Sequence, residues 1–175
     1  YYSRVRNLHK AAKIVTQEHG ARVPDTLESI AQLPGIGRYT AGAVLSIAFE
    51  KRVPVLDGNV KRVLSRWFCV SENGTTSTSQ HRLWKLAESV LPHCDVGDFN
   101  QAMMELGATV CLPKNPACFF CAVKTFCEAN RQNRQNEFPP SKAKTVSTKI
   151  EVSAAVIWRH GKVFIQQRPK NGLMG

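Results

Sequence analysis

Four cysteines stand close together in the second half of the chain, in the pattern C-x6-C-x2-C-x5-C: Cys111, Cys118, Cys121 and Cys127. Thiolates are soft ligands, and four of them in so short a segment can converge on one tetrahedral or cubane metal centre. The spacing favours a [4Fe-4S] cluster over zinc, because zinc knuckles usually pair two C-x2-C units and this segment has one. Two disulfides, or four buried structural thiols, are the alternatives.

The pentapeptide Leu33-Pro34-Gly35-Ile36-Gly37 is a second pattern that could do chemistry. Gly35 and Gly37 let the backbone turn sharply and approach another molecule closely. Their amides, with the free N–H groups that open the next helix, could bind a phosphate, and Arg38 follows directly. An ordinary turn between two helices is the alternative. In a basic chain the pattern resembles the helix-hairpin-helix of DNA-binding enzymes, whose phosphate contacts position a protein without reading bases.

Asp57 is the third candidate, because it stands between an apolar extended stretch, residues 53–56, and a predicted helix. A lone aspartate at such a place is usually an N-cap. However, the helix predicted for residues 39–49 can return the chain so that Asp57 lies near the phosphate-binding turn. There the carboxylate could take part in a reaction.

The elements that must position these motifs are mainly helices, as the hydrophobic periodicity indicates. Asp25 is the expected N-cap of the second of them, with Glu28 three residues further on. Helices are predicted at residues 4–19, 25–32, 39–49, 59–68, 79 or 80 to 91, and 98–110.

A change of composition after Cys127 indicates a second part of the chain. Residues 128–148 are rich in Asn, Gln, Arg, Lys and Pro, which predicts a linker. Beyond it, the β-rich runs Ile150–Trp158 and Lys162–Gln167, joined by Arg159-His160-Gly161, predict a hairpin that opens another domain.

The bulk composition narrows the function. Hydrophobic residues make up 43% of the 175 residues, enough for a sizeable core. The formal net charge of +11 favours a polyanionic partner such as nucleic acid. No apolar run is long enough to span a membrane. The chain begins at Tyr1 without a methionine and ends at Gly175 in a predicted strand and turn, so we expect a fragment of a longer protein.

Taken together, L-P-G-I-G-R-Y-T-A-G-A, then L-D-G-N-V-K-R-V, then the four-cysteine pattern resemble the helix-hairpin-helix DNA glycosylase superfamily with its iron–sulfur loop. Within it, the chain is similar to the MutY-type adenine DNA glycosylases. The endonuclease III branch carries a catalytic lysine where this chain has Tyr39. Such a lysine would form a Schiff base and add strand cleavage. The resemblance therefore implies a monofunctional glycosylase.

The resemblance also implies a fold class and a domain organisation. The fold is expected to be mainly α, a helix-hairpin-helix glycosylase domain over residues 1–127 with its cluster loop at 111–127. After the linker at 128–148, residues 149–175 are expected to start an α/β Nudix-like domain, which Gln167-Arg168-Pro169 also fits.

The family pattern assigns roles to individual residues. Asp57 is expected to stabilise the positive charge that develops on the deoxyribose. Asn59 is expected to orient it, and Tyr39 to lie in the same pocket. Tyr1 or Tyr2 is expected to wedge the duplex. The remaining DNA contacts are expected at Arg4, Gly35, Gly37, Arg38, Lys61 and Arg62, and the cluster ligands at Cys111, Cys118, Cys121 and Cys127.

The expected partner is double-stranded DNA with A·8-oxoguanine or A·G mispairs, bound by a monomer that does not contact membranes. The location would be the cytoplasm of a bacterium, or the nucleus or mitochondrion of a eukaryote. The family's general-acid glutamate is expected upstream of Tyr1, so the fragment alone should be inactive. The alternatives are an endonuclease III-like glycosylase/lyase and a DNA-binding module without chemistry.

Overall fold

The computed structural model describes residues 2–71, 77–140, 149, 151 and 153–166. The chain forms two compact units, Tyr1–Lys142 and Ala143–Gly175. Among the described residues, no helix has the length and apolar character needed to cross a membrane.

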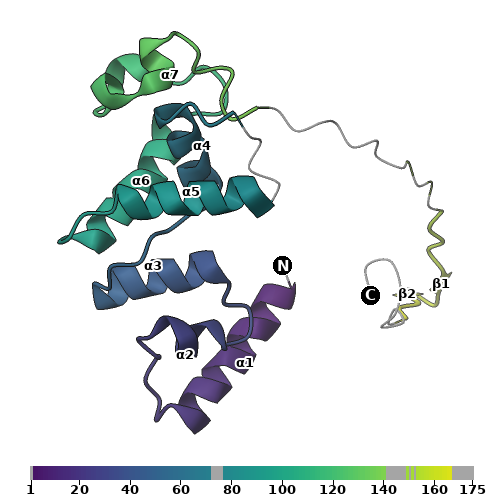
Figure 1. Cartoon of the computed structure of the whole chain (residues 1–175). Helices are drawn as coiled ribbons and strands as arrows, with labels where there is room; N and C mark the ends of the chain where they lie inside the picture. The colour runs from purple at the N-terminus through teal and green to yellow at the C-terminus, as the bar shows by residue number, and fades with distance from the viewer. Residues whose placement is uncertain (1, 72–76, 141–148, 150, 152, 167–175) are drawn as a thin grey trace. The chain divides into compact units, whose positions relative to one another are not determined.

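The first unit is helical, as the periodicity predicts, and its elements follow one another along the colour gradient of Figure 1. The order is α1 (Tyr2–Glu18), α2 (Leu27–Ala31), α3 (Arg38–Phe49), α4 (Gly58–Trp67), α5 (Ser77–Ser89), α6 (Val96–Thr109), the 3-10 turns η1 (Cys118–Phe120) and η2 (Lys124–Phe126), and α7 (Glu128–Arg131).

Two apolar clusters hold these helices together. The smaller one joins α1, α2 and α3 through Ala11, Ile30, Leu33, Ala41 and Leu45. The larger one joins the 53–56 stretch to α4, α5 and α6 through Val55, Leu56, Val60, Val63, Leu64, Val70, Leu83, Ala87 and Met103. The hairpin turn therefore belongs to one cluster and the cysteine loop adjoins the other.

Helix α6 connects the two clusters because it packs against both α3 and α4. At its start, Gly97 lies against the backbone of α3, where an added Cβ would stand 2.7 Å from the Ser46 carbonyl oxygen. One turn further on, the amide of Asn100, which is 2% exposed, donates a hydrogen bond of 2.9 Å to the carbonyl of Val53. This face of α6 thus fixes the strand-like stretch that leads to Asp57.

The N-cap of one helix differs from the prediction. Helix α2 is capped by Thr26 and not by Asp25: the Thr26 hydroxyl accepts from the Ser29 amide at 3.3 Å. Asp25 instead pairs with Lys51 at 3.1 Å on the surface. The misplacement has a simple reason, since Thr and Asp are both good caps and adjacent in sequence.

The apolar face predicted for α1 is only partly covered. Ala11 is buried, whereas Val5 and Leu8 are 67% and 71% exposed. The first turns of α1 therefore have the amphipathic pattern of a packed helix without a cover among the described residues.

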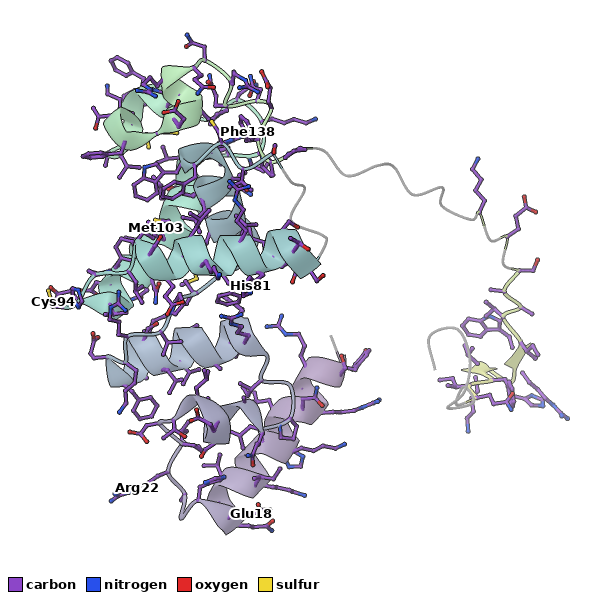
Figure 2. The ribbon with its side chains drawn as sticks, in the orientation of Figure 1. Glu18, Arg22, His81, Cys94, Met103 and Phe138 are labelled. Carbon is purple, nitrogen blue, oxygen red and sulfur yellow. The ribbon has the colours of Figure 1, made fainter. Side chains whose placement is uncertain are left out.

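The segment after Cys127, predicted as a linker, folds against α4 in its first part. It contains α7, and both Ala129 and Phe138 are buried. Figure 2 shows Phe138 at the end of the unit where α4 and α7 lie. The low apolar content of this segment misled the prediction, because two well-placed apolar side chains are enough to dock it.

In the second unit, the predicted hairpin is present but short. Strand β1 (Trp158–Arg159) pairs antiparallel with β2 (Lys162–Val163), with Trp158 opposite Val163. His160 and Gly161 at the turn have φ of 49° and 70°, the positive values that suit a tight hairpin turn. Ile150 and Gln167-Arg168-Pro169 lie outside the described residues.

Candidate active site and metal centre

Asp57 is the N-cap of α4, as one of its two interpretations predicts. Its Oδ1 accepts a 2.7 Å hydrogen bond from the Val60 amide, and its Oδ2 accepts from the Asn59 side-chain amide at 3.2 Å. Both carboxylate oxygens are therefore held by residues of the same helix start. A carboxylate at a helix N-terminus is also stabilised by the helix dipole. The result is a half-buried carboxylate with a fixed orientation.

Asn59 is held in turn by a close contact with α6. A Cβ on Gly107 would lie 2.6 Å from the Asn59 Cβ and 2.9 Å from its carbonyl carbon. Only a glycine therefore allows α6 to approach the start of α4 at this distance. The sequence analysis did not single out Gly107, although a glycine inside a predicted helix is a signal of close approach.

Tyr39 and Asn59 lie against neighbouring turns of the same helix. The Tyr39 hydroxyl contacts Met104 Sδ at 3.4 Å, while Asn59 contacts Gly107. Residues three apart share a face of a helix, so α6 brings the start of α3 and the start of α4 together. The structure thus brings Tyr39 and Asn59 to one face of α6, and Asp57 is linked to that face through its hydrogen bond with Asn59.

Arg62 points into the protein rather than offering its donors to DNA. Its guanidinium donates to Asn59 Oδ1 at 2.9 Å, to the Gly107 carbonyl at 2.5 Å and to the Cys111 carbonyl at 2.7 Å. This arrangement differs from the predicted phosphate contact. It connects Asn59 with the first residue of the cysteine loop. Lys61, on the same helix, is half-buried.

The glycine turn has the conformation that its sequence requires. Gly35 has a φ of +81°, which favours glycine, and the Ile36 amide donates to the Leu33 carbonyl at 3.1 Å. Gly37 is the N-cap of α3 and has no side chain over the first amides of that helix. These N–H groups are open to a ligand.

The turn shares a groove with α1. Arg4, Asn7 and Leu8 of α1 line it together with Gly35 and Thr40. Two of the predicted DNA contacts, Arg4 and Gly35, are thereby brought to one site. Tyr2 begins α1 and is 82% exposed, and Tyr1 lies outside the described residues.

Arg38 has a partner inside the protein. Its guanidinium carbon lies 4.0 Å from the centre of the Trp84 ring on α5, which is cation–π geometry. If Arg38 also binds a phosphate, as predicted, its guanidinium must do so while it stacks on the Trp84 ring. A stacked arginine keeps donors at its edge, so the two roles are compatible.

The four predicted metal ligands line one cavity. Cys111, Cys118, Cys121 and Cys127 form its wall together with Arg66 and Gln135. All six cysteines of the chain are free thiols, which contradicts the disulfide alternative.

The donor set of the cavity is four thiols, the soft ligands of thiolate-bound metal centres. Among the residues that the structure describes, no three His, Cys, Asp or Glu side chains are close enough to hold one metal ion. A single zinc would need its sulfurs about 2.3 Å from one point. An iron–sulfur cubane spreads its ligands, because each thiolate binds a different iron. Four thiols around one shared cavity are a donor set that either kind of centre uses.

Burial raises the pKa of the Cys118 thiol, and the charges of Cys111 and Cys121 raise it further. Burial likewise raises the pKa of Cys127. Four thiolates crowded together in this way are unfavourable unless a cation compensates them. Binding to a metal supplies that compensation, because the metal takes up the deprotonated sulfur.

Arg66 is the cavity residue that the sequence analysis missed. It is 2% exposed and has donor contacts to Cys111 Sγ at 3.2 Å and to four backbone carbonyls, those of Leu112, Pro113, Gln135 and Phe138. Arg66 therefore ties the start of the cysteine loop to the segment that follows it. Its position three residues after Val63 on the buried face of α4 was the available signal.

Comparison with known proteins places this architecture in a class. Residues 18–47 match the family model "Helix-hairpin-helix motif", a range that contains the glycine turn. The chain resembles the solved structure of a thermostable thymine-DNA glycosylase, with 34% identity and a TM-score of 0.65, covering 74% of this chain and 59% of that one. A trapped endonuclease III–DNA covalent intermediate shares the fold, with a TM-score of 0.61 at 24% identity. The mainly helical part thus has the fold of the helix-hairpin-helix DNA glycosylases.

The relatives narrow the class further. The adenine DNA glycosylase of Rattus norvegicus is 48% identical over 81% of this chain and 28% of its own length. That of Buchnera aphidicola (subsp. Acyrthosiphon pisum) is 38% identical over 94% of this chain and 47% of its own length. The chain is a homologue of the adenine DNA glycosylases, and it spans about half or less of the length of these curated relatives.

Proposed function

We propose that the protein containing this chain is a monofunctional adenine DNA glycosylase of base-excision repair. It hydrolyses the N-glycosidic bond of adenine that is mispaired with 8-oxoguanine or guanine. The observation that carries this proposal is the carboxylate of Asp57, which Val60 and Asn59 hold at the start of α4, where Gly107 lets α6 pack closely on Asn59. The relatives of this chain in Rattus norvegicus and Buchnera aphidicola are named adenine DNA glycosylases, which supports the proposal.

In the reaction, the bond between C1′ and the adenine nitrogen breaks, and the sugar acquires the positive charge of an oxocarbenium-like transition state. Asp57 faces this charge and lowers its energy by electrostatic attraction. A water oxygen then bonds to C1′ and gives up a proton, while the leaving adenine gains one. Asn59 keeps the carboxylate oriented throughout, because its amide donates to Oδ2. The proton donor to adenine is not assigned to a residue of this chain.

The absence of an amine at position 39 supports hydrolysis without strand cleavage. Tyr39, whose hydroxyl contacts Met104, starts α3 where a lysine could otherwise attack the sugar. A phenol cannot form a Schiff base, so the enzyme should leave an intact abasic strand.

The DNA-binding surface is proposed along the groove between α1 and the glycine turn. Arg4 supplies a cation, and the amides after Gly35 and Gly37 supply donors for a phosphate. Either Tyr2, exposed at the start of α1, or Tyr1 is proposed as the wedge that fills the space left by the flipped adenine. Arg38 and Lys61 are proposed as additional phosphate contacts. The enzyme acts as a monomer in a compartment that contains DNA.

The proposed cofactor is a [4Fe-4S] cluster held by Cys111, Cys118, Cys121 and Cys127, with zinc as the weaker candidate. The cluster would supply four metal–sulfur bonds that cross-link the 111–127 loop, which Arg66 of α4 contacts through Cys111, Leu112 and Pro113. Hydrolysis needs no electron transfer, so the chemistry assigns the cluster a structural role.

We further propose that residues 149–175 begin a Nudix-like domain, a proposal that the hairpin at 158–163 supports.

The experiment is single-turnover excision by the full-length gene product on a duplex with one A·8-oxoguanine pair. Adenine release without nicking, and without an adduct trapped by borohydride, supports a monofunctional glycosylase. A borohydride adduct would favour the glycosylase/lyase alternative. Tight binding without release would favour a DNA-binding module.

A further inference from the structure

One buried polar atom in the wall of the cysteine cavity has no partner. Oε1 of Gln135 accepts no hydrogen bond, and it is the single buried side-chain polar atom in this condition among the described residues. Gln135 lines the cavity together with all four cysteines. A buried amide oxygen without a donor is unfavourable, so the orientation of this amide at the cavity needs an explanation.

The backbone of Gln135 is well fixed at this place. Its carbonyl accepts a 2.8 Å hydrogen bond from Arg66 Nε, the same guanidinium that contacts Cys111 Sγ at 3.2 Å. Phe138, three residues further on, is 5% exposed and also accepts from Arg66. The docked segment therefore fixes the backbone of Gln135 at the wall of the cysteine cavity, and its side-chain Oε1 is buried there.

The chemistry of the cavity decides which end of the amide should face inward. The oxygen and nitrogen of a glutamine amide are interchangeable by a half-turn of the group. The cavity wall is rich in sulfur, which accepts hydrogen bonds, and its arginine donors are already engaged. The oxygen meets no donor in the structure, whereas an N–H in its place could donate to the sulfur acceptors of the cavity.

We propose that Gln135 donates an amide N–H to a sulfur of the metal centre held by the four cysteines, and that Gln135 and Arg66 together form a donor pair that sets its reduction potential. The inference rests on the proposed cofactor. Such contacts are positioning and tuning interactions, because neither residue is a ligand. An N–H pointing at sulfur stabilises the more negative, reduced state, so it raises the potential.

The test is the reduction potential of the cluster in the full-length protein, measured together with iron and sulfide per chain. Gln135→Leu removes the donor at similar volume, and Gln135→Glu replaces it with a carboxylate of the same shape. Gln132→Leu is the matched control, since Gln132 is exposed, does not line the cavity and contacts Glu128. We expect both Gln135 variants to shift the potential to more negative values, Glu further than Leu, and the control to leave it unchanged.

Iron release to a chelator gives a second measurement on the same samples. The Gln135 variants should lose iron several-fold faster than the parent and the control. If Gln135→Leu fails to load iron, Gln135→Glu, with its unchanged shape, still reports the shift. Potentials and release rates equal to those of the control would overturn the assignment of Gln135 and leave the cluster itself intact. A parent protein that binds zinc and no iron would overturn the proposed cofactor, and this inference with it.

Discussion

The two ends of helix α4 hold side chains in opposite ways. At its start, Asp57 is fixed by partners two and three residues away, Asn59 and Val60, and remains half-buried. At its last turn, Arg66 is 2% exposed, and its partners lie 45 to 72 residues further along the chain. The proposed chemistry thus uses a locally fixed, accessible carboxylate. The cofactor site depends on a cation that only the complete fold can satisfy.

Arg62 lies between these ends of α4 and contacts one residue of each site, Asn59 and Cys111. It donates to Asn59 near the carboxylate and to the Cys111 carbonyl at the start of the cysteine loop. The two ends are therefore joined through one guanidinium. Variants at each end show how far the loop and the carboxylate depend on one another.

The largest effect is expected from Arg66→Met. It would leave four backbone carbonyls without their donor, and each buried unsatisfied group costs about 1–3 kcal/mol. We expect a loss of at least about 3 kcal/mol in the free energy of unfolding by urea, with most of the iron lost. Arg66→Lys should recover part of both, because it keeps the charge. A fully stable, iron-loaded Arg66→Met protein would contradict the claim that the cysteine loop depends on the hydrogen bonds of Arg66.

Gly107→Ala should have the next largest effect. The new methyl would stand 2.6 Å from the Asn59 Cβ, so α6 and the start of α4 must separate. Overpacking of this kind costs about 1–3 kcal/mol. Adenine excision should also fall, at least about 10-fold, because Asn59 orients Asp57 and each 1.4 kcal/mol corresponds to tenfold. Single-turnover rates and urea unfolding measure the two effects.

A matched control for stability is Gly58→Ala. It adds the same methyl group one residue from Asp57, where no atom lies within 4 Å. Its free energy of unfolding should stay within about 0.5 kcal/mol of the parent. Equal losses in the two variants would contradict the proposed close packing of α6 on Asn59.

Asp57 itself should matter little for stability. Asp57→Ala removes the N-cap and should cost about 1 kcal/mol, whereas Asp57→Asn retains a capping oxygen and should cost a few tenths. Thermal unfolding of both variants measures the difference. A large loss in Asp57→Asn would mean that the carboxylate is mainly structural.

The smallest effect is expected for Tyr39→Phe. It removes one hydroxyl that contacts a methionine sulfur, a weak acceptor, and Tyr39 is 38% exposed. The free energy of unfolding should change by less than about 0.5 kcal/mol. A larger loss would indicate that the Tyr39–Met104 contact, and not the close packing of Gly97 on Ser46, holds α3 against α6.

The same contrast explains what the sequence could predict. The helices, the glycine turn, the Asp57 cap and the cysteine set are local patterns, and the structure contains each of them. The inward direction of Arg62, the buried Arg66 and the docking of Phe138 depend on segments that are distant in sequence. Nothing near Arg66 in the chain indicates that four carbonyls would surround it. Asp25 and Thr26 show the remaining source of error, two equivalent caps side by side.

The most direct test compares the full-length protein with its Asp57→Asn variant in single-turnover adenine release from an A·8-oxoguanine duplex. Thermal unfolding and iron content must be equal in the two proteins. The account predicts release by the parent, a loss of at least about 100-fold in the variant, and no strand nicking by either. Equal release by both proteins would contradict the role of Asp57, and binding without release by the parent would contradict the proposed enzymatic function.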